Sequence, residues 1–235
     1  MATEIKQQSK ERTRQGLLEQ SRALLPVMFV MYAPVLILFA IIGLQTRIPV
    51  ENLTRDPLAI TRAPFYIGAI SNIGILFWCS AVAICFFSFR LLRDIGRNKE
   101  FQRFFLFSGD LTSILLLDDL FLLHEEVFPY YLNIPEKLVF VGYGMIISLY
   151  LVKFRKIILK TEFLFFLLAF GFLGLSVIID LLPIPTRLLG NQGEFLLEDG
   201  FKLTGIISWF TYFARVGVTQ LKRAIAPNYP ILSEQ

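Results

Sequence analysis

The chain has 235 residues, of which 55% are hydrophobic and 18% are charged, and its formal net charge is +4. A typical soluble domain is about 45 to 50% apolar and about 25% charged, so both values indicate a protein of the lipid bilayer. The composition excludes a disordered chain. It also argues against nucleic-acid binding, because the basic residues lie between apolar runs rich in Phe, Leu and Ile.

The first 23 residues are polar, and we expect them to form a cytoplasmic segment ahead of the first apolar block. That block, residues 24–44, is longer than the roughly 7 to 15 residue apolar core of a signal peptide. No small-x-small cleavage pattern follows it. It is therefore interpreted as a retained helix rather than a secretory signal.

Six apolar blocks come close to the roughly 20 residues that a helix needs to cross about 30 Å of hydrocarbon. They cover residues 24–44, 66–89, 104–123, 138–152, 163–182 and 195–214. The connections are too short for a soluble domain, and residues 216–235 form a tail. The prediction is an all-α polytopic membrane protein, with a six-helix transmembrane bundle over residues 24–215.

The distribution of Lys and Arg predicts the orientation of these spans. Seventeen of the 23 basic residues fall on the side of the two termini, five fall on the other side, and Lys202 lies inside the last span. Because cytoplasmic loops carry the excess of basic residues, both termini are predicted to be cytoplasmic. The expected location is a bacterial plasma membrane or its equivalent.

Ionisable side chains interrupt the apolar spans, at an insertion cost on the order of 2.5 to 3.5 kcal/mol each. They are Asp110, Asp118, Asp119, Asp180, Glu198, Asp199 and Lys202. Apart from Asp110, they come from the third, fifth and sixth spans at one depth in the outer third of the membrane. Charged residues in a span mark a functional site by default, so we expect the site there.

The acids of this region outnumber the bases, which limits how they can be charged. Five carboxylates facing one lysine cannot all stay ionised in a medium of low dielectric constant, so protons, a cation or water must join them. The expected proton or cation acceptors are Asp118, Asp119, Asp180, Glu198 and Asp199, with Lys202 as counter-ion. Secondary candidates are His124, Glu125, Asp110, Asn72 and Tyr143.

Helical spacing gives two expectations about contacts within this group. Lys202 follows Glu198 by four residues and Asp199 by three, so both carboxylates are within its reach on the same helix. Asp118 and Asp119 are the alternative partners, and pairing with them would fix the helix packing. An uninterrupted third helix would place Asp118 and Glu125 on one face and His124 on another. Histidines at the end of a span usually lie in the interface, and the same is expected of His124.

Four functional hypotheses follow. Proton- or cation-linked transport or conduction is favoured, because acids of several helices meet at one depth. A less favoured alternative is an intramembrane enzyme with an oxygen-ligated metal and a lipid-like substrate; the single histidine excludes a three-histidine zinc centre. Lys202 in the last helix, four residues after an acid, is superficially similar to microbial rhodopsins, but six spans and its outer position argue against a retinal pigment. The charges of an accessory or assembly subunit would serve helix packing alone.

No motif in the chain requires a cofactor. Cys79 and Cys85 lie six residues apart in one span, on different faces of a helix, and form no Cys-x-x-Cys pattern. The expected partners are the lipid bilayer and a proton or cation, with no nucleic acid. An oligomer or a larger membrane complex is compatible with the sequence.

Overall fold

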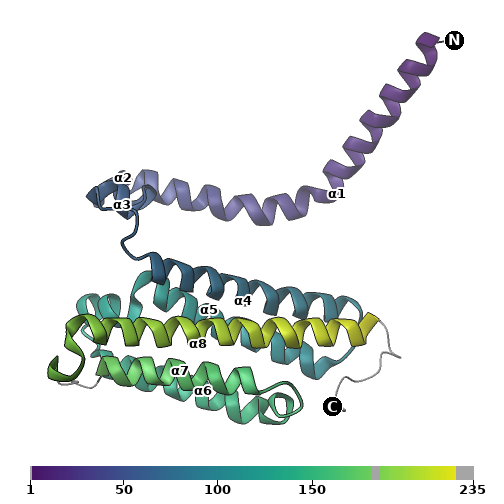
Figure 1. Cartoon of the computed structure of the whole chain (residues 1–235). Coiled ribbons are helices and arrows are strands. Elements are labelled where there is room, and N and C mark those ends of the chain that lie inside the picture. Colours follow the sequence, from purple (N-terminus) through teal and green to yellow (C-terminus); the bar gives the residue numbers. More distant parts are fainter. Residues whose placement is uncertain (1, 182–185, 226–235) are drawn as a thin grey trace. The chain divides into compact units, whose positions relative to one another are not determined.

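The computed structural model describes residues 2–181 and 186–225. The protein is all-α, with 86% of the chain helical and no strand in these two ranges. The chain forms two compact units, residues 1–67 and 68–235, which we describe separately (Figure 1). The end of the fifth predicted span at residue 182 and the tail beyond residue 225 lie outside the described ranges.

The first unit is dominated by one long helix, α1 (Ala2–Leu44), in which the predicted polar segment and the first apolar block are continuous. Two short helices follow, α2 (Val50–Thr54) and α3 (Pro57–Thr61). Asp56 caps α3 by accepting hydrogen bonds from the backbone N–H groups of Leu58 and Ala59. The apolar part of α1 buries nothing within its unit, so its side chains are free to contact lipid or another protein.

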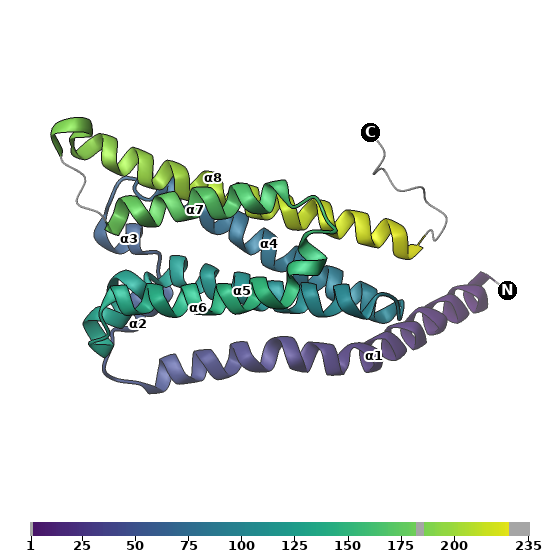
Figure 2. The same ribbon diagram turned by 90° about the horizontal axis from the view of Figure 1, so that it is seen from below.

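In its described residues, the second unit is a bundle of five long helices with one π-helical connection; Figures 1 and 2 show how they are arranged. In chain order the elements are α4 (Ala69–Asp94), α5 (Lys99–Phe121), the π-helix η1 (Leu123–Tyr131), α6 (Glu136–Ile158), α7 (Leu164–Leu181) and α8 (Thr186–Ile225). Helix α8 packs against α4 and α7, α4 packs against α5, and α6 contacts α5 and η1. Short connections between antiparallel neighbours produce this arrangement.

A helix covers most of each of the six predicted apolar ranges, and three of these helices are long and apolar enough to cross a membrane. Their candidate spans are Leu24–Leu44, Ala69–Asp94 and Glu136–Ile158. Helix α5 has the same 23-residue length as α6, but it carries Asp110, Asp118 and Asp119. A six-helix transmembrane bundle and the orientation of its ends stay predictions.

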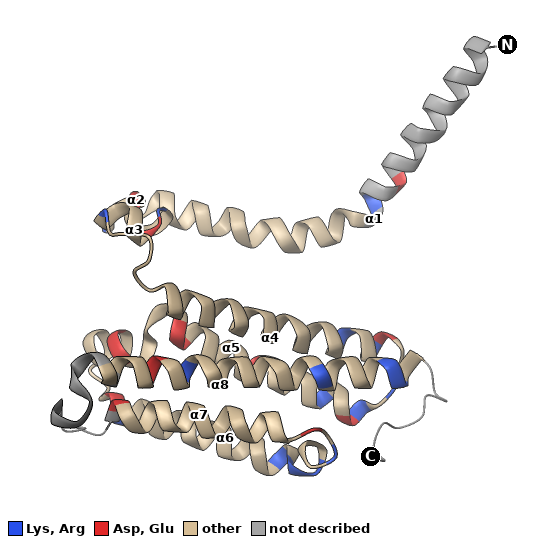
Figure 3. Ribbon diagram, viewed as in Figure 1, with Lys and Arg blue, Asp and Glu red and all other residues tan. Residues whose placement is uncertain are grey.

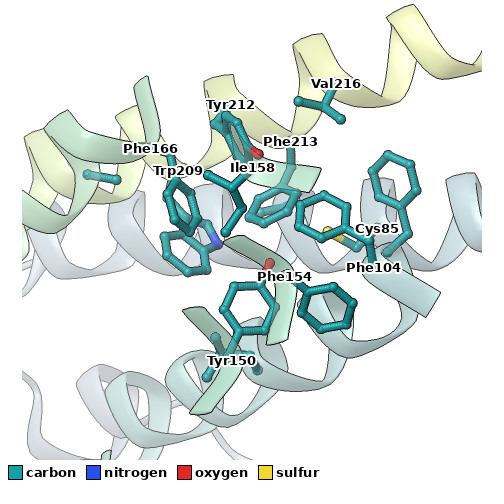
Figure 4. Close-up of a cluster of buried hydrophobic side chains, with 14 of the residues drawn as sticks. Cys85, Phe104, Tyr150, Phe154, Ile158, Phe166, Trp209, Tyr212, Phe213 and Val216 are labelled. Carbon is teal, nitrogen blue, oxygen red and sulfur yellow. The ribbon is translucent and has the colours of Figure 1, made fainter. Parts of the chain in front are cut away.

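Aromatic side chains fill the centre of the second unit (Figure 4). We call this cluster the aromatic block; it consists of Phe104, Tyr150, Phe154, Phe166, Trp209, Tyr212 and Phe213, all of them buried. The Trp209 ring stacks on Phe166, with 5.5 Å between the ring centroids. Such pairs add to the stability that burial alone provides.

The polar atoms inside this block have partners. The Trp209 indole N–H donates to the Thr112 hydroxyl at 3.0 Å. The Tyr150 and Ser108 hydroxyls are 2.7 Å apart, and both residues are buried. Burying these groups therefore does not cost the penalty of an unmade hydrogen bond.

Small residues allow the helices of this unit to approach closely. A Cβ on Gly205 would lie 2.7 Å from Leu173 Cγ and 3.0 Å from its backbone nitrogen, which shows how tightly α8 packs on α7. A Cβ on Gly109 would lie 2.8 Å from the Phe86 ring, at the contact of α5 with α4. Close contacts at small residues are typical of helix packing in membranes.

The two ends of the bundle carry opposite charge (Figure 3). The end where α4 finishes and α5 begins, here called the basic end, carries Arg90, Arg93, Arg97, Lys99, Arg103, Lys153, Arg155, Lys156, Lys160, Arg215, Lys222 and Arg223 together with Asp94, Glu100 and Glu162. The opposite end, the acidic end, carries Asp118, Asp119, Glu125, Glu126, Glu136, Asp180, Glu198 and Asp199 together with Lys137 and Lys202. This asymmetry is the pattern that the positive-inside rule describes.

Candidate functional site

The α-helix is interrupted after α5, and this helix break shapes the acidic end. Helix α5 ends at Phe121, and Leu122 follows in the left-handed conformation with φ of +50°. A left-handed backbone is unusual for a bulky residue such as leucine, because glycine alone adopts it without a steric penalty. The α-helix thus stops two residues before the predicted end of the span at residue 123, and the nine residues of η1 follow. The expected helical phase of His124 and Glu125 is therefore wrong, because the helix stops before them.

The Asp118 carboxylate makes hydrogen bonds across this helix break. Its Oδ1 accepts hydrogen bonds from the backbone N–H of His124 at 3.0 Å and from the Tyr143 hydroxyl at 2.7 Å. Its Oδ2 lies 2.6 Å from Nδ1 of the His124 ring. An ionised carboxylate only accepts hydrogen bonds, so Nδ1–H is the donor of this pair. Asp118 thus joins α5, η1 and α6 through one buried carboxylate.

His124 is buried, whereas the sequence predicted an interfacial residue. Its Nε2 lies 3.4 Å from Oε1 of Glu125, whose side chain is 47% exposed. Burial in η1 lowers the pKa of His124, but the hydrogen bond and the charge of Asp118 outweigh burial, so the pKa is raised overall. The protonated ring is therefore favoured between two carboxylates.

Asp119, the next residue, faces a different partner. Lys202 Nζ lies 2.5 Å from Asp119 Oδ1, and the Asp119 side chain is only 6% exposed. This contact is an ion pair without the geometry of a directed hydrogen bond, and neither carboxylate oxygen has a well-formed hydrogen bond within the described ranges. Of the carboxylates that the sequence placed within reach of Lys202, the structure pairs its ammonium group with the buried Asp119 of α5.

A small cavity of about 30 Å³ lies beside this ion pair. It is lined by Ile70, Ser71, Gly74, Asp119, Asp199, Lys202, Leu203 and Ile206, from α4, α5 and α8. The space exists because Gly74 has no side chain: a Cβ there would lie 3.9 Å from Asp119 Oδ2 and 3.1 Å from Ile206 Cδ1. Its volume suits one or two water molecules or a small ion.

The remaining predicted acids lie around this pair. Asp180 is exposed and Glu198 is half-buried, and the charge of Asp180 acts on Glu198. The charges of Asp199 and Glu125 act on Lys202. These four acids, which we call the rim, are near enough for their charges to act on one another or on Lys202.

Two secondary candidates do not join the site. Asp110 and Asn72 are both exposed, and neither makes a side-chain hydrogen bond in the part of the chain that the structure describes. Tyr143, another secondary candidate, does join it through Asp118. No three His, Cys, Asp or Glu side chains come together in a metal-binding arrangement within residues 2–181 and 186–225.

Sequence reasoning missed Ser71 and Gly74, which shape the cavity, because neither residue type signals a site by itself. It also missed the break at Leu122, since leucine carries no signal for a left-handed backbone. Pro129 within η1 was the available hint that the α-helix does not continue through this segment.

Comparison with known proteins gives a family without an activity. No curated protein and no solved structure matches the chain. One family matches residues 27–216, a range that includes every residue of the candidate site. The chain belongs to this family, which is described as a domain of unknown function, DUF8692.

Proposed function

We propose that this protein is an integral membrane protein with a proton-linked transport function, and that its acidic end takes up and releases the proton. Three helices long and apolar enough to span a bilayer support the location. The charge asymmetry of the second unit supports an orientation with the basic end in the cytoplasm. The acidic end then faces the outside.

The observation that carries this proposal is a chain of polar groups leading from the interior to the surface. Tyr143 donates to the buried Asp118, Asp118 accepts from the His124 ring, and the ring faces the half-exposed Glu125. Histidine between two carboxylates is suited to pass a proton, because each of its ring nitrogens faces one of them. A proton arriving at Glu125 thus has a route of two steps to Asp118.

The aromatic block favours transport with a conformational step over conduction through an open pore. Trp209, Tyr212 and Phe213 have no more than 1% exposure and lie in the unit that holds the site. A packed interior of this kind leaves no continuous path for an ion. Loss of the Asp118 charge would weaken its hold on the His124 backbone, which links the proton to the position of η1.

Proton flux into proteoliposomes, followed with an enclosed pH-sensitive dye under an imposed potential, tests this proposal. Asp118→Asn and His124→Gln are expected to reduce flux at least about tenfold, because each removes a step of the chain. Asp110→Asn is the matched control, since Asp110 is an exposed acid of the same helix; it should leave flux unchanged. Absence of flux in the wild type, or full flux in both variants, overturns the proposal.

A packing role within a membrane complex is the second candidate, and one observation favours it. Asp118 makes its hydrogen bonds to η1 and α6, so it also fixes the connection between α5 and α6. In that case Asp118→Asn would lower thermal stability while the wild type shows no flux. Measuring stability and flux on the same samples separates the two functions.

A further inference from the structure

We propose that the cavity beside Asp119 is a binding site for one small monovalent inorganic cation of the sodium class, and that the Lys202 ammonium competes with this cation. The proposal goes beyond the proton route, which runs through Asp118 and His124. It concerns the neighbouring carboxylate and a different set of helices, α4, α5 and α8.

The first support is a buried carboxylate oxygen without a partner among the described residues. Asp119 is 6% exposed, and Lys202 reaches Oδ1. Oδ2 has no partner among the described residues and lies on the side of the cavity that Gly74 leaves open. A buried carboxylate oxygen without a partner is costly, and a cation or water in the cavity removes that cost.

The second support is the balance of charge around the cavity. Its lining includes the carboxylates of Asp119 and Asp199 and the ammonium of Lys202, which sum to one negative charge when all are ionised. One monovalent cation brings this sum to zero. A divalent cation would leave a positive excess in a partly buried space, which is unfavourable.

The third support is the chemistry of the donors. Asp119, Asp199 and the hydroxyl of Ser71 offer oxygen atoms only, and hard cations prefer oxygen ligands. The cavity of about 30 Å³ admits one ion with little accompanying water. No third carboxylate or imidazole completes a site for a transition metal in the described ranges. The cavity opens to solvent past Ser71 and Asp199, which are exposed.

Lys202 is placed to act as the competitor. Its side chain is 31% exposed, unlike that of Asp119. The charges of Glu125 and Asp199 also attract its ammonium group toward the rim. A long flexible side chain moves its charge at little cost, so a cation can take the place next to Asp119 while Lys202 turns toward Asp199, and the charge of the cavity lining with its cation stays at zero.

Thermal unfolding of the full-length purified protein in sodium chloride and in choline chloride, at equal ionic strength, tests this site. We expect sodium to raise the Tm of the wild type above its value in choline, because a ligand bound only by the folded state stabilises it. Lys202→Met removes the competing charge, so the half-saturating sodium concentration should fall by about tenfold or more. Gly74→Ala narrows the cavity and should raise it.

Two further variants separate this site from the proton route. Asp119→Asn should abolish the difference between sodium and choline, whereas Asp110→Asn should keep it. His124→Gln, which interrupts the proton route, should keep the sodium effect in full. The sodium site can therefore be confirmed even if the proposed proton transport is disproved. Equal Tm values in sodium and choline for both the wild type and Lys202→Met would overturn the proposal, as would a sodium effect that persists in Asp119→Asn.

Discussion

The aromatic block and the acidic end of the second unit bury polar groups in opposite ways. In the block, the Trp209 indole and the Tyr150 hydroxyl each have a neutral partner at hydrogen-bond distance. At the acidic end, Asp119 is almost as buried, but its oxygens face an ammonium group and a cavity without a well-formed hydrogen bond. Neutral pairs stabilise a fold in every condition, whereas charged and incompletely paired groups respond to protons and ions.

This difference divides the bundle into a half that maintains the structure and a half that can respond. The packed half contains the tightest helix contacts, such as Gly205 against Leu173. The other half contains the strained residue Leu122, the π-helix and the cavity that Asp119, Asp199 and Lys202 line. Strain and unusual helices concentrate at functional sites in this way. Substitutions in the two halves should therefore affect different measurements.

The largest effect on stability is expected for Trp209→Ala. The indole is fully buried, so its removal leaves a cavity and takes away the hydrogen bond that the Thr112 hydroxyl accepts, although this hydroxyl keeps its bond to the Ser108 carbonyl. Loss of such a side chain costs about 3 to 5 kcal/mol of the free energy of unfolding. Denaturant titration of the protein in detergent measures this change. Trp209→Phe is the matched control, because it keeps the ring packing and should lose only about 0.5 to 1.5 kcal/mol, the value of one hydrogen bond.

Lys202→Met should have the next largest effect. This substitution leaves the buried Asp119 carboxylate without the Lys202 ammonium group. Breaking a fully buried ion pair in this way lowers the free energy of unfolding by about 3 to 5 kcal/mol. The partial exposure of Lys202 reduces this to about 1 to 3 kcal/mol. The same titration on the double variant Asp119→Leu/Lys202→Met should recover most of the loss, since no charge is then left unpaired. No recovery would mean that packing of the Lys202 stem, rather than its charge, matters.

Gly205→Ala tests the packed half at one helix contact. The new Cβ would lie 3.0 Å from the backbone nitrogen of Leu173, and a backbone cannot shift as easily as the end of a side chain. Overpacking of this kind costs about 1 to 3 kcal/mol, more than the gain in helix propensity. In Gly200→Ala, a substitution in the same helix, the new Cβ meets no atom within 4 Å, so this variant should be neutral or stabilising. Denaturant titration of both variants measures the difference.

How much of the fold the sequence predicts depends on the length of each pattern. The apolar runs at 66–89 and 163–182 correspond closely to α4 and α7, because roughly 20 apolar residues bounded by polar ones leave little choice of structure. The run at 138–152 is shorter than α6, since the helix continues through the charged residues Lys153, Arg155 and Lys156. Charges at a helix end do not stop a helix, so hydropathy alone underestimates its length.

The candidate site is predicted less completely, and the reason is local. Asp118, Asp119 and Lys202 stand out because charge is rare in apolar runs. Their partners do not follow from helical spacing, because the left-handed Leu122 turns His124 back onto Asp118. The pairing of Lys202 with Asp119 depends on contacts between α4, α5 and α8 that no spacing within one helix reveals.

The pH dependence of stability should distinguish the responsive half from the packed half with a smaller effect. The pKa of His124 is raised in the folded protein. Its stabilising contribution is therefore complete below about pH 6.5, the ordinary pKa of histidine, and is lost as the pH rises through the higher folded-state value. Tm measured across that range should fall for the wild type. His124→Gln should remove this part of the slope, and an unchanged slope would assign it to other groups.

The smallest effect is expected for Glu162→Gln at the basic end, where Arg215 forms a two-pronged ion pair with Glu162. The hydrogen bond from Arg215 lowers the pKa of Glu162, and slight burial opposes this shift. The pair therefore stabilises the fold above the ordinary pKa of glutamate and loses that contribution as the pH falls through the lower folded-state value.

Both side chains of this pair are about half exposed, at 54% and 53%, compared with 6% for Asp119. Water and salt screen an exposed pair, so Glu162→Gln should lower Tm only slightly, and not at all in molar salt. The same titration on Asp119→Asn, carried out with choline chloride, should leave its Tm deficit largely intact, because a buried pair is screened much less. Equal salt sensitivity of the two variants would contradict the division of the bundle into a packed and a responsive half, since it would place Asp119 in contact with bulk solvent.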